Sequence, residues 1–224
     1  AKASAPILSE FDARSLSNLI YSIGLSEYIP KVEDGRTILD VLALEAMSKL
    51  QHFNSQDLSN MLWSYAKVEL SNSLLFKAAG DVIMGMKDMS IFIPQALSNI
   101  LWSFATAGQS HPLLFQKLAH AVISRSNEFN SQDIANLLWA YATVGLIDQH
   151  LFTSIAPAVK SVLGQCNSQN VANIAWAYAV ADVNDPSLFN SDFIDALQAK
   201  ANDFVPENLS QLYQWQLWQD ELKS

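Results

Sequence analysis

The sequence predicts an all-α fold, an α-solenoid of tandem two-helix repeats of about 37–39 residues. Two observations carry this prediction. One helical motif recurs along the chain, for example as NSQDLSNMLWSYAKVE (54–69), NSQDIANLLWAYATVG (130–145) and NSQNVANIAWAYAVAD (167–182). Half of the residues are hydrophobic, and only 7 of 224 are Gly and 7 are Pro, which is typical of a packed helical protein.

The recurring motif defines a signature helix with aligned positions. Its asparagine recurs as Asn18, Asn60, Asn99, Asn136 and Asn173, with Gln211 as a degenerate sixth copy. Three residues later stand Tyr21, Trp63, Trp102, Trp139 and Trp176, and two further on Ile23, Tyr65, Phe104, Tyr141 and Tyr178. We interpret the asparagines and tryptophans as a structural repeat signature, with the aromatic rings packed in the core between repeats.

The start of each signature helix is marked by capping residues. Asp12, Asn54, Asn130 and Asn167 are good N-caps, and Pro94 and Pro206 fit the first helical turn where such a cap is missing. Glycine is favoured just past a helix end, so Gly24, Gly108 and Gly145 are expected to end their helices.

A second helix is predicted in the rest of each repeat. A Leu-Phe pair anchors it at Phe76, Phe115, Phe152 and Phe189, in the segments 71–86, 111–126, 149–163 and 185–200. We therefore expect one solenoid domain over 1–224, with repeat units at about 9–50, 51–89, 90–126, 127–163 and 164–202, a degenerate C-terminal cap at 203–224, and a right-handed superhelix. The start AKASAP lacks Met, which indicates a fragment of a longer protein, with any targeting peptide upstream.

The signature helices resemble octotricopeptide repeats and, equally, heptatricopeptide repeats, and the terminal LSQLYQWQLW resembles the segment before a RAP domain. The resemblance covers about residues 9–219. It implies a non-enzymatic RNA-binding protein of a chloroplast or mitochondrion, which acts in transcript processing, translation or ribosome assembly. A C-terminal RAP domain, whose fold in that family is nuclease-like, would lie beyond this chain.

Composition limits how RNA would be bound. The net charge of −9 disfavours binding driven by a basic surface. A local stripe is still possible, because one basic residue per repeat falls eleven to thirteen residues before the signature asparagine. These phosphate-contact candidates are Lys49, Lys87, Arg125, Lys160 and Lys200. The alternative is that each cation interacts favourably with the negative end of its own helix.

Base readout is expected at positions that differ between repeats, because target bases differ. Base-contact candidates follow the Leu-Phe anchor: Lys77, Gln116, Thr153 and Asn190. An ordinary solvated helix position is the alternative. The asparagines, which do not vary, either read base edges or form a ladder between neighbouring repeats, and their invariance favours the ladder.

No catalytic or cofactor site is predicted. The four histidines have no metal-ligand spacing, and the single cysteine, Cys166, excludes an intrachain disulfide and fits a small buried hydrophobic residue. No segment approaches the length of a membrane span. We expect single-stranded or ribosomal RNA as partner, with protein partners possible along the concave face, and no metal, cofactor or membrane. The alternative function is a protein-interaction scaffold, such as a subunit of an organellar ribosome; a processing enzyme would need the C-terminal region beyond this chain.

Overall fold

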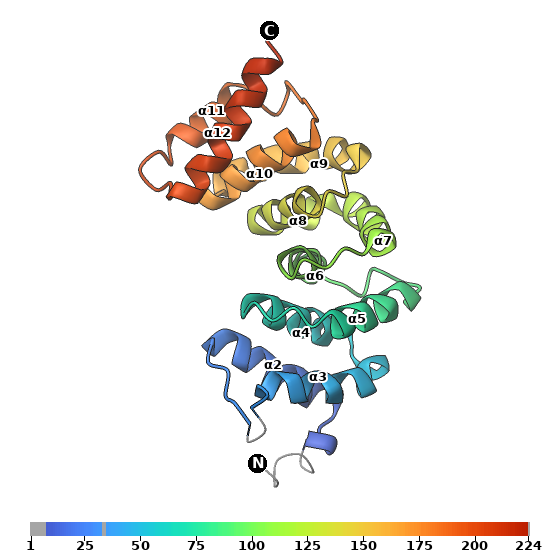
Figure 1. Ribbon diagram of the computed structural model, residues 1–224. Coiled ribbons are helices and arrows are strands. Elements are labelled where there is room, and N and C mark those ends of the chain that lie inside the picture. The colour runs from blue at the N-terminus through green and yellow to red at the C-terminus, as the bar shows by residue number, and fades with distance from the viewer. Residues whose placement is uncertain (1–7, 33–34, 224) are drawn as a thin grey trace. The chain divides into compact units, whose positions relative to one another are not determined.

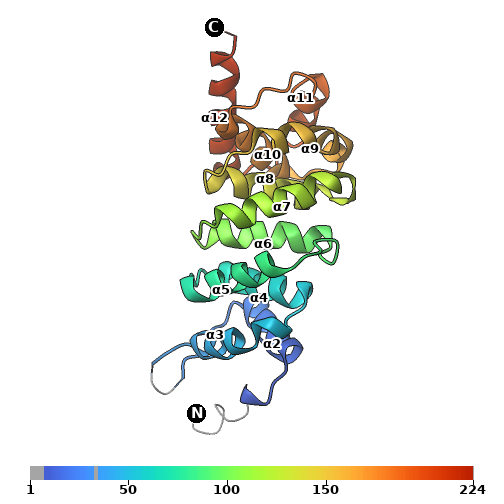
Figure 2. The ribbon, with the colours of Figure 1, turned by 90° about the vertical axis from the view of Figure 1, so that its right-hand side faces the viewer.

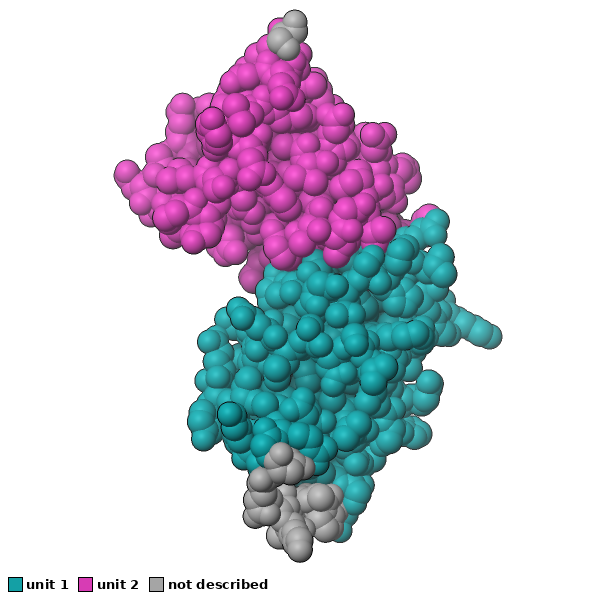
Figure 3. Space-filling view, viewed as in Figure 1, with its two compact units in different colours: residues 1–117 teal, residues 118–224 magenta. Residues whose placement is uncertain are grey.

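The computed structural model describes residues 8–32 and 35–223, and these residues confirm the predicted all-α, solenoid-like fold (Figure 1). Most of them are helical and none is in a β-strand. The chain forms two compact units, 1–117 and 118–224, with the boundary inside helix α7 (Figure 3).

Signature helices and second helices alternate along the chain. The signature helices are α2 (Ala13–Ser26), α4 (Ser55–Lys67), α6 (Pro94–Thr106), α8 (Ser131–Thr143), α10 (Ser168–Ala181) and α12 (Pro206–Glu221). The second helices are α3 (Ile38–Lys49), α5 (Ser73–Gly85), α7 (Pro112–Ser124), α9 (Gln149–Val162) and α11 (Ser191–Gln198). Short 3₁₀ turns at Leu50–His52, Ser126–Glu128 and Leu163–Gln165 lead from α3, α7 and α9 into the following signature helices.

Within each unit, signature helices stack directly on one another. In unit 1, α4 contacts both α2 and α6; in unit 2, α10 contacts both α8 and α12 (Figures 1 and 2). Each second helix lies beside this stack. The repeat boundaries and the right-handed superhelix remain predictions.

The predicted N-caps are confirmed. The side chains of Asp12, Asn54, Asn130 and Asn167 each accept a hydrogen bond from a backbone N–H in the first helical turn. Asp57 completes a capping box in α4, because its carboxylate also accepts the N–H of Asn54 at 3.1 Å. α6 and α12 have no side-chain cap and begin instead with Pro94 and Pro206, as expected.

The aromatic position five residues after the signature asparagine fills the core. Tyr65, Phe104, Tyr141 and Tyr178 are at most 1% exposed. The Tyr65 hydroxyl donates to the carbonyl of Leu39 at 2.6 Å, and the Tyr178 hydroxyl to that of Phe152 at 2.8 Å. Burial raises the pKa of both phenols, so they stay protonated donors. Each bond joins a signature helix to the second helix before it.

Two local predictions were wrong. Gly24 does not end its helix: α2 continues to Ser26 and ends at Glu27, which has a positive φ of 53°. Gly108 and Gly145 do follow helix ends with positive φ, as expected. The helix predicted at 185–200 is only α11, Ser191–Gln198, because the Asn190 side chain caps it there by accepting the N–H groups of Asp192 and Phe193.

Candidate nucleic-acid interface

One face of α4, α6, α8 and α10 combines amide and aromatic side chains. On α4 these are Gln56, Asn60 and Trp63, whose spacings of four and three residues put them on the same face. The same set recurs as Gln95, Asn99 and Trp102 on α6, Gln132, Asn136 and Trp139 on α8, and Gln169, Asn173 and Trp176 on α10. Each unit therefore repeats one surface pattern, which we call the amide–tryptophan face.

A groove of about 150 Å³ lies between α4 and α6 on this face. Gln56 and Asn60 line it from one helix, and Gln95 and Asn99 from the other. The two glutamines are exposed and the two asparagines half-buried. None of the four side-chain amides hydrogen-bonds to another of the described residues, so each keeps donors and an acceptor for a ligand. We call this site the amide groove.

At the equivalent interface between α10 and α12, the side-chain amides bond to each other. The Gln211 amide donates to the side-chain oxygen of Asn173 at 2.9 Å, and Asn173 is buried. Next to it, the Trp176 indole N–H donates to Gln214 at 2.8 Å. Asn173 and Gln211 therefore form the predicted ladder, whereas Asn60 and Asn99 do not bond to each other. Because the asparagines occupy equivalent positions in the repeats, the sequence alone could not show which of them bond to the next signature helix.

The tryptophans were predicted to pack in the core between repeats, and they are only partly buried there. Trp63, Trp102, Trp139 and Trp176 are all half-buried. Tyr21 contacts Trp63 across neighbouring helices, with ring centroids 5.5 Å apart. The helical pattern contained the signal, because this position lies about 100° from the apolar stripe in a helix of 3.6 residues per turn. The exposed part of each indole ring therefore belongs to the amide–tryptophan face, where it offers an aromatic surface for stacking with another ring.

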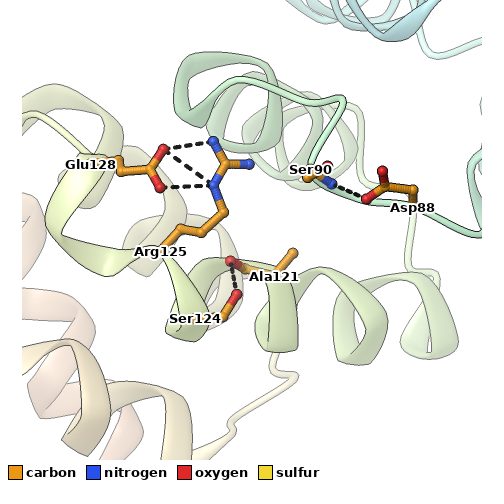
Figure 4. A network of polar contacts seen from close by, with 6 residues as sticks. All are labelled: Asp88, Ser90, Ala121, Ser124, Arg125 and Glu128. Carbon is orange, nitrogen blue, oxygen red and sulfur yellow. Dashed lines mark hydrogen bonds and ion pairs between the residues drawn. The ribbon is translucent and has the colours of Figure 1, made fainter.

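Four of the five phosphate-contact candidates already bond within the protein. Lys49 pairs with Glu45 at 2.7 Å and donates to the carbonyls of Ser9 and Phe11. Arg125 makes a forked pair with Glu128, with a closest distance of 2.7 Å, and the nearby Ser124 hydroxyl donates to the carbonyl of Ala121 (Figure 4).

Lys160 and Lys200 are less firmly held. The Lys160 ammonium donates to the Ser187 hydroxyl, and that of Lys200 to the carbonyl of Ala196 in the preceding helix α11 at 3.2 Å. Lys87 is exposed in the connection between α5 and α6. Of the five, Lys87 is the candidate most open to a phosphate, and it stands six residues before Ile93, which lines the amide groove.

Lys117 has a structural role that sequence reasoning missed. Its ammonium donates to the carbonyls of Ile83, Met84 and Met86 at the end of α5. A cation there compensates the negative end of the helix. The partner helix is distant in sequence, so no local pattern reveals the contact.

The base-contact candidates lie on the second helices, apart from Asn190. Gln116 is exposed on α7, Thr153 on α9 donates to the carbonyl of Gln149, and Lys77 on α5 pairs with Asp81 at 2.8 Å. Asn190 caps α11 and is not on a helix surface, because the preceding residues are a turn. The amide groove is lined by residues of α4 and α6 and by Ile93, the residue that precedes α6, and by none of the second helices.

Cys166 is a buried hydrophobic residue, as predicted. It is 4% exposed and precedes the N-cap of α10, as the buried Phe53, Phe92 and Phe129 precede theirs. Burial raises the pKa of its thiol to about 11, although Lys200 acts in the opposite direction.

We expect Cys166 to resist thiol reagents in the native protein. At pH 8 a shift of this size leaves roughly 100-fold less thiolate than an ordinary cysteine has. Reaction with Ellman's reagent should therefore be about 100-fold slower or more in buffer than in guanidinium chloride. Similar rates in the two solvents would contradict the burial.

The described residues contain no group of three or more His, Cys, Asp or Glu side chains placed to hold a metal ion. Among the same residues, no helix is long and apolar enough to cross a membrane.

The fold and the repeated face define a helical-repeat protein. Residues 3–213 match the family model described as RNA-editing substrate-binding complex 6 protein, and the chain belongs to this family. The match supports the RNA-associated, helical-repeat class that the resemblance implied, and it does not specify octotricopeptide or heptatricopeptide repeats. A search of curated proteins found no match.

Proposed function

We propose that this chain is a non-enzymatic RNA-binding module of an organellar RNA-processing factor, and that its signature helices hold a single RNA strand with about one base per repeat. The family's description, an RNA-editing substrate-binding complex protein, supports the RNA class. The resemblance of the repeats supports the organelle, chloroplast or mitochondrion. The amide groove is the observation that carries the binding mode.

The groove has the chemistry that an unpaired base requires. A base edge presents both donors and acceptors, and a carboxamide supplies both. Four such groups, two from each helix, surround one groove without a protein partner among the described residues. The half-buried Trp63 and Trp102, on the same helix faces, provide ring surface on which neighbouring bases can stack.

The phosphates would lie near the start of the signature helices. α6 begins without a side-chain cap, so the positive end of its dipole adjoins the groove at Ile93 and Gln95. Lys87 precedes this helix, and Arg14 is exposed on α2 at the position equivalent to Gln56. Residues 1–117 contain 11 acidic and 9 basic side chains, against 11 and 4 in residues 118–224, so the first unit repels an anion less.

Because base contacts outnumber phosphate contacts in this mode, we expect weak dependence of affinity on salt. The strand should bind with a shallow slope of log affinity against log salt, unlike a protein that relies on a basic surface. Fluorescence anisotropy with a labelled random single-stranded RNA at varied salt tests this. No binding at low salt would contradict the proposal and favour the scaffold alternative.

The decisive variant removes the two asparagines of the amide groove. Replacing Asn60 and Asn99 by alanine should weaken RNA binding roughly 30-fold, because two hydrogen bonds of about 1 kcal/mol each are lost. Alanine is a better helix former than asparagine, so the fold should be kept, and circular dichroism verifies it.

The matched control changes Gln116 and Thr153 to alanine on the second helices. If the groove is the base site, this variant binds RNA like the wild type. The opposite pattern, with loss only in the control, would place base readout on the second helices.

A further inference from the structure

Three positions on each signature helix face the next signature helix in the stack. They lie two residues before, two after and six after the signature asparagine, a four-residue spacing that forms one stripe. Gly24 of α2 shows the direction: a Cβ at Gly24 would lie 2.7 Å from the Cβ of Ser64 on α4. We call this stripe the forward stripe.

The forward stripe is buried, apart from the half-buried Ala179 of α10, where a signature helix follows in the same unit. On α4, Leu58, Leu62 and Ala66 are at most 1% exposed. On α8, Ile134 and Leu138 are fully buried and Ala142 is 5% exposed. Contact with the next signature helix therefore normally buries this stripe.

The last signature helix breaks this rule. The forward stripe of α12 consists of Leu209, Tyr213 and Leu217, which are 52%, 65% and 46% exposed. The buried side of the same helix carries Trp215, so α12 has large apolar side chains on both sides. Large apolar side chains grouped on an exposed helix face are typical of an interaction site.

The first signature helix lacks such a face. On the side of α4 that meets α2 lie Asp57, whose carbonyl accepts from Ser17, and Ser64. The equivalent residues of α2 are Ser15 and Ser22, both exposed.

The acidic residues of α12 indicate that a partner of this surface is basic. α12 itself carries three acidic side chains and no basic one, and Lys223, two residues past its end, lies 3.8 Å from Asp220. Glu207 is exposed at the start of α12, and Asp220 and Glu221 at its end. Basic side chains beside an apolar stripe would complement this surface.

The same residues argue against a second copy of the chain. An antiparallel pair of α12 helices would bring Glu207 against Asp220 and Glu221, acid against acid. Docking of α12 on α2 of another copy would place a signature helix against Leu217. A further signature helix is also disfavoured, because Leu217 occupies the position of Gly24 and Ala66, where a small residue allows close approach.

We propose that the forward stripe of α12 docks a basic amphipathic helix of a partner protein. The partner helix places leucine-like side chains at a spacing of three and four residues against Leu209, Tyr213 and Leu217. Its lysines or arginines flank that stripe and meet the acidic ends of α12. This surface is independent of the amide groove.

The probe is a 20-residue synthetic helix with leucines on one face and lysines on the others. Fluorescence anisotropy of the labelled peptide should give saturable binding to the wild-type chain. A scrambled peptide of the same composition, and a peptide with glutamates in place of lysines, should bind at least tenfold more weakly. Equal binding of the original and scrambled peptides would overturn the proposal, since it would show attraction by charge alone.

The decisive variant changes Leu209, Tyr213 and Leu217 to glutamine. All three are exposed, so the fold should be kept, and peptide affinity should fall at least tenfold while RNA affinity is unchanged. The control changes Leu74 and Leu113, exposed by 68% and 64% in unit 1, to glutamine and should bind the peptide like the wild type. Unchanged peptide binding in the triple variant would overturn the proposal. So would wild-type dimers in sedimentation velocity that the triple variant abolishes, because they would assign the stripe to a second copy.

Discussion

Replacing Phe152 by alanine is expected to lower the free energy of unfolding of unit 2 by about 4 kcal/mol. The ring is fully buried in α9 and meets Tyr178 of α10 edge to face, with centroids 5.1 Å apart. Its removal loses this aromatic contact and leaves a cavity between the two helices. Guanidinium denaturation, followed by circular dichroism, measures the loss.

Two neighbouring variants separate the ring from the rest of this contact. Changing Tyr178 to phenylalanine removes only the hydroxyl that donates to the Phe152 carbonyl, and should cost about 1–2 kcal/mol because a buried acceptor loses its partner. Changing the exposed Thr153 to alanine should alter stability by less than about 0.5 kcal/mol. If Phe152 behaved like Thr153, the aromatic contact would not support unit 2.

The effect should be strongest near the substitution. Stability in a repeat array is approximately a sum over repeats and their interfaces, so a lost contact weakens its own interface first. Hydrogen exchange should therefore show faster opening of α9 and α10 than of α4 and α5 in the Phe152 variant.

Local features of this fold could be predicted from the sequence because neighbouring residues determine them. Asn54 caps α4 by accepting the N–H of Asp57, and Pro94 starts α6 without a cap. Tyr65 follows the apolar periodicity into the core. Each of these outcomes needs only the chain within one or two helical turns.

Features that depend on the opposing helix could not be predicted. Lys49, a member of the basic band that resembled a phosphate ridge, donates to the carbonyls of Ser9 and Phe11. Lys117, outside that band, donates to the end of α5, and both contacts join residues more than 30 positions apart. Asn60 and Asn173 occupy equivalent positions, yet one lines an open groove and the other bonds to Gln211. The residue across the interface decides between the two outcomes, and sequence periodicity does not report it.

The role of Gly24 also depends on the opposing helix, and its substitution gives the second large prediction. Replacing it by valine should destabilise unit 1 by about 3 kcal/mol, the upper end for overpacking a tight contact. An added Cβ would lie 2.7 Å from the Cβ and Oγ of Ser64 and 2.9 Å from its Cα, so the α4 backbone itself must move. Denaturation and the hydrogen exchange of α2 would record the change.

Gly85 supplies the matched control, because it is also a helical glycine but has no heavy atom within 4 Å of an added Cβ. Valine there should be nearly neutral, since glycine and valine differ little in helix propensity. A similar loss in both variants would mean that backbone propensity, and not the approach of α2 to α4, sets the need for glycine. A loss at Gly24 alone would establish that its role is to bring neighbouring signature helices together, the spacing on which the amide groove between α4 and α6 also depends.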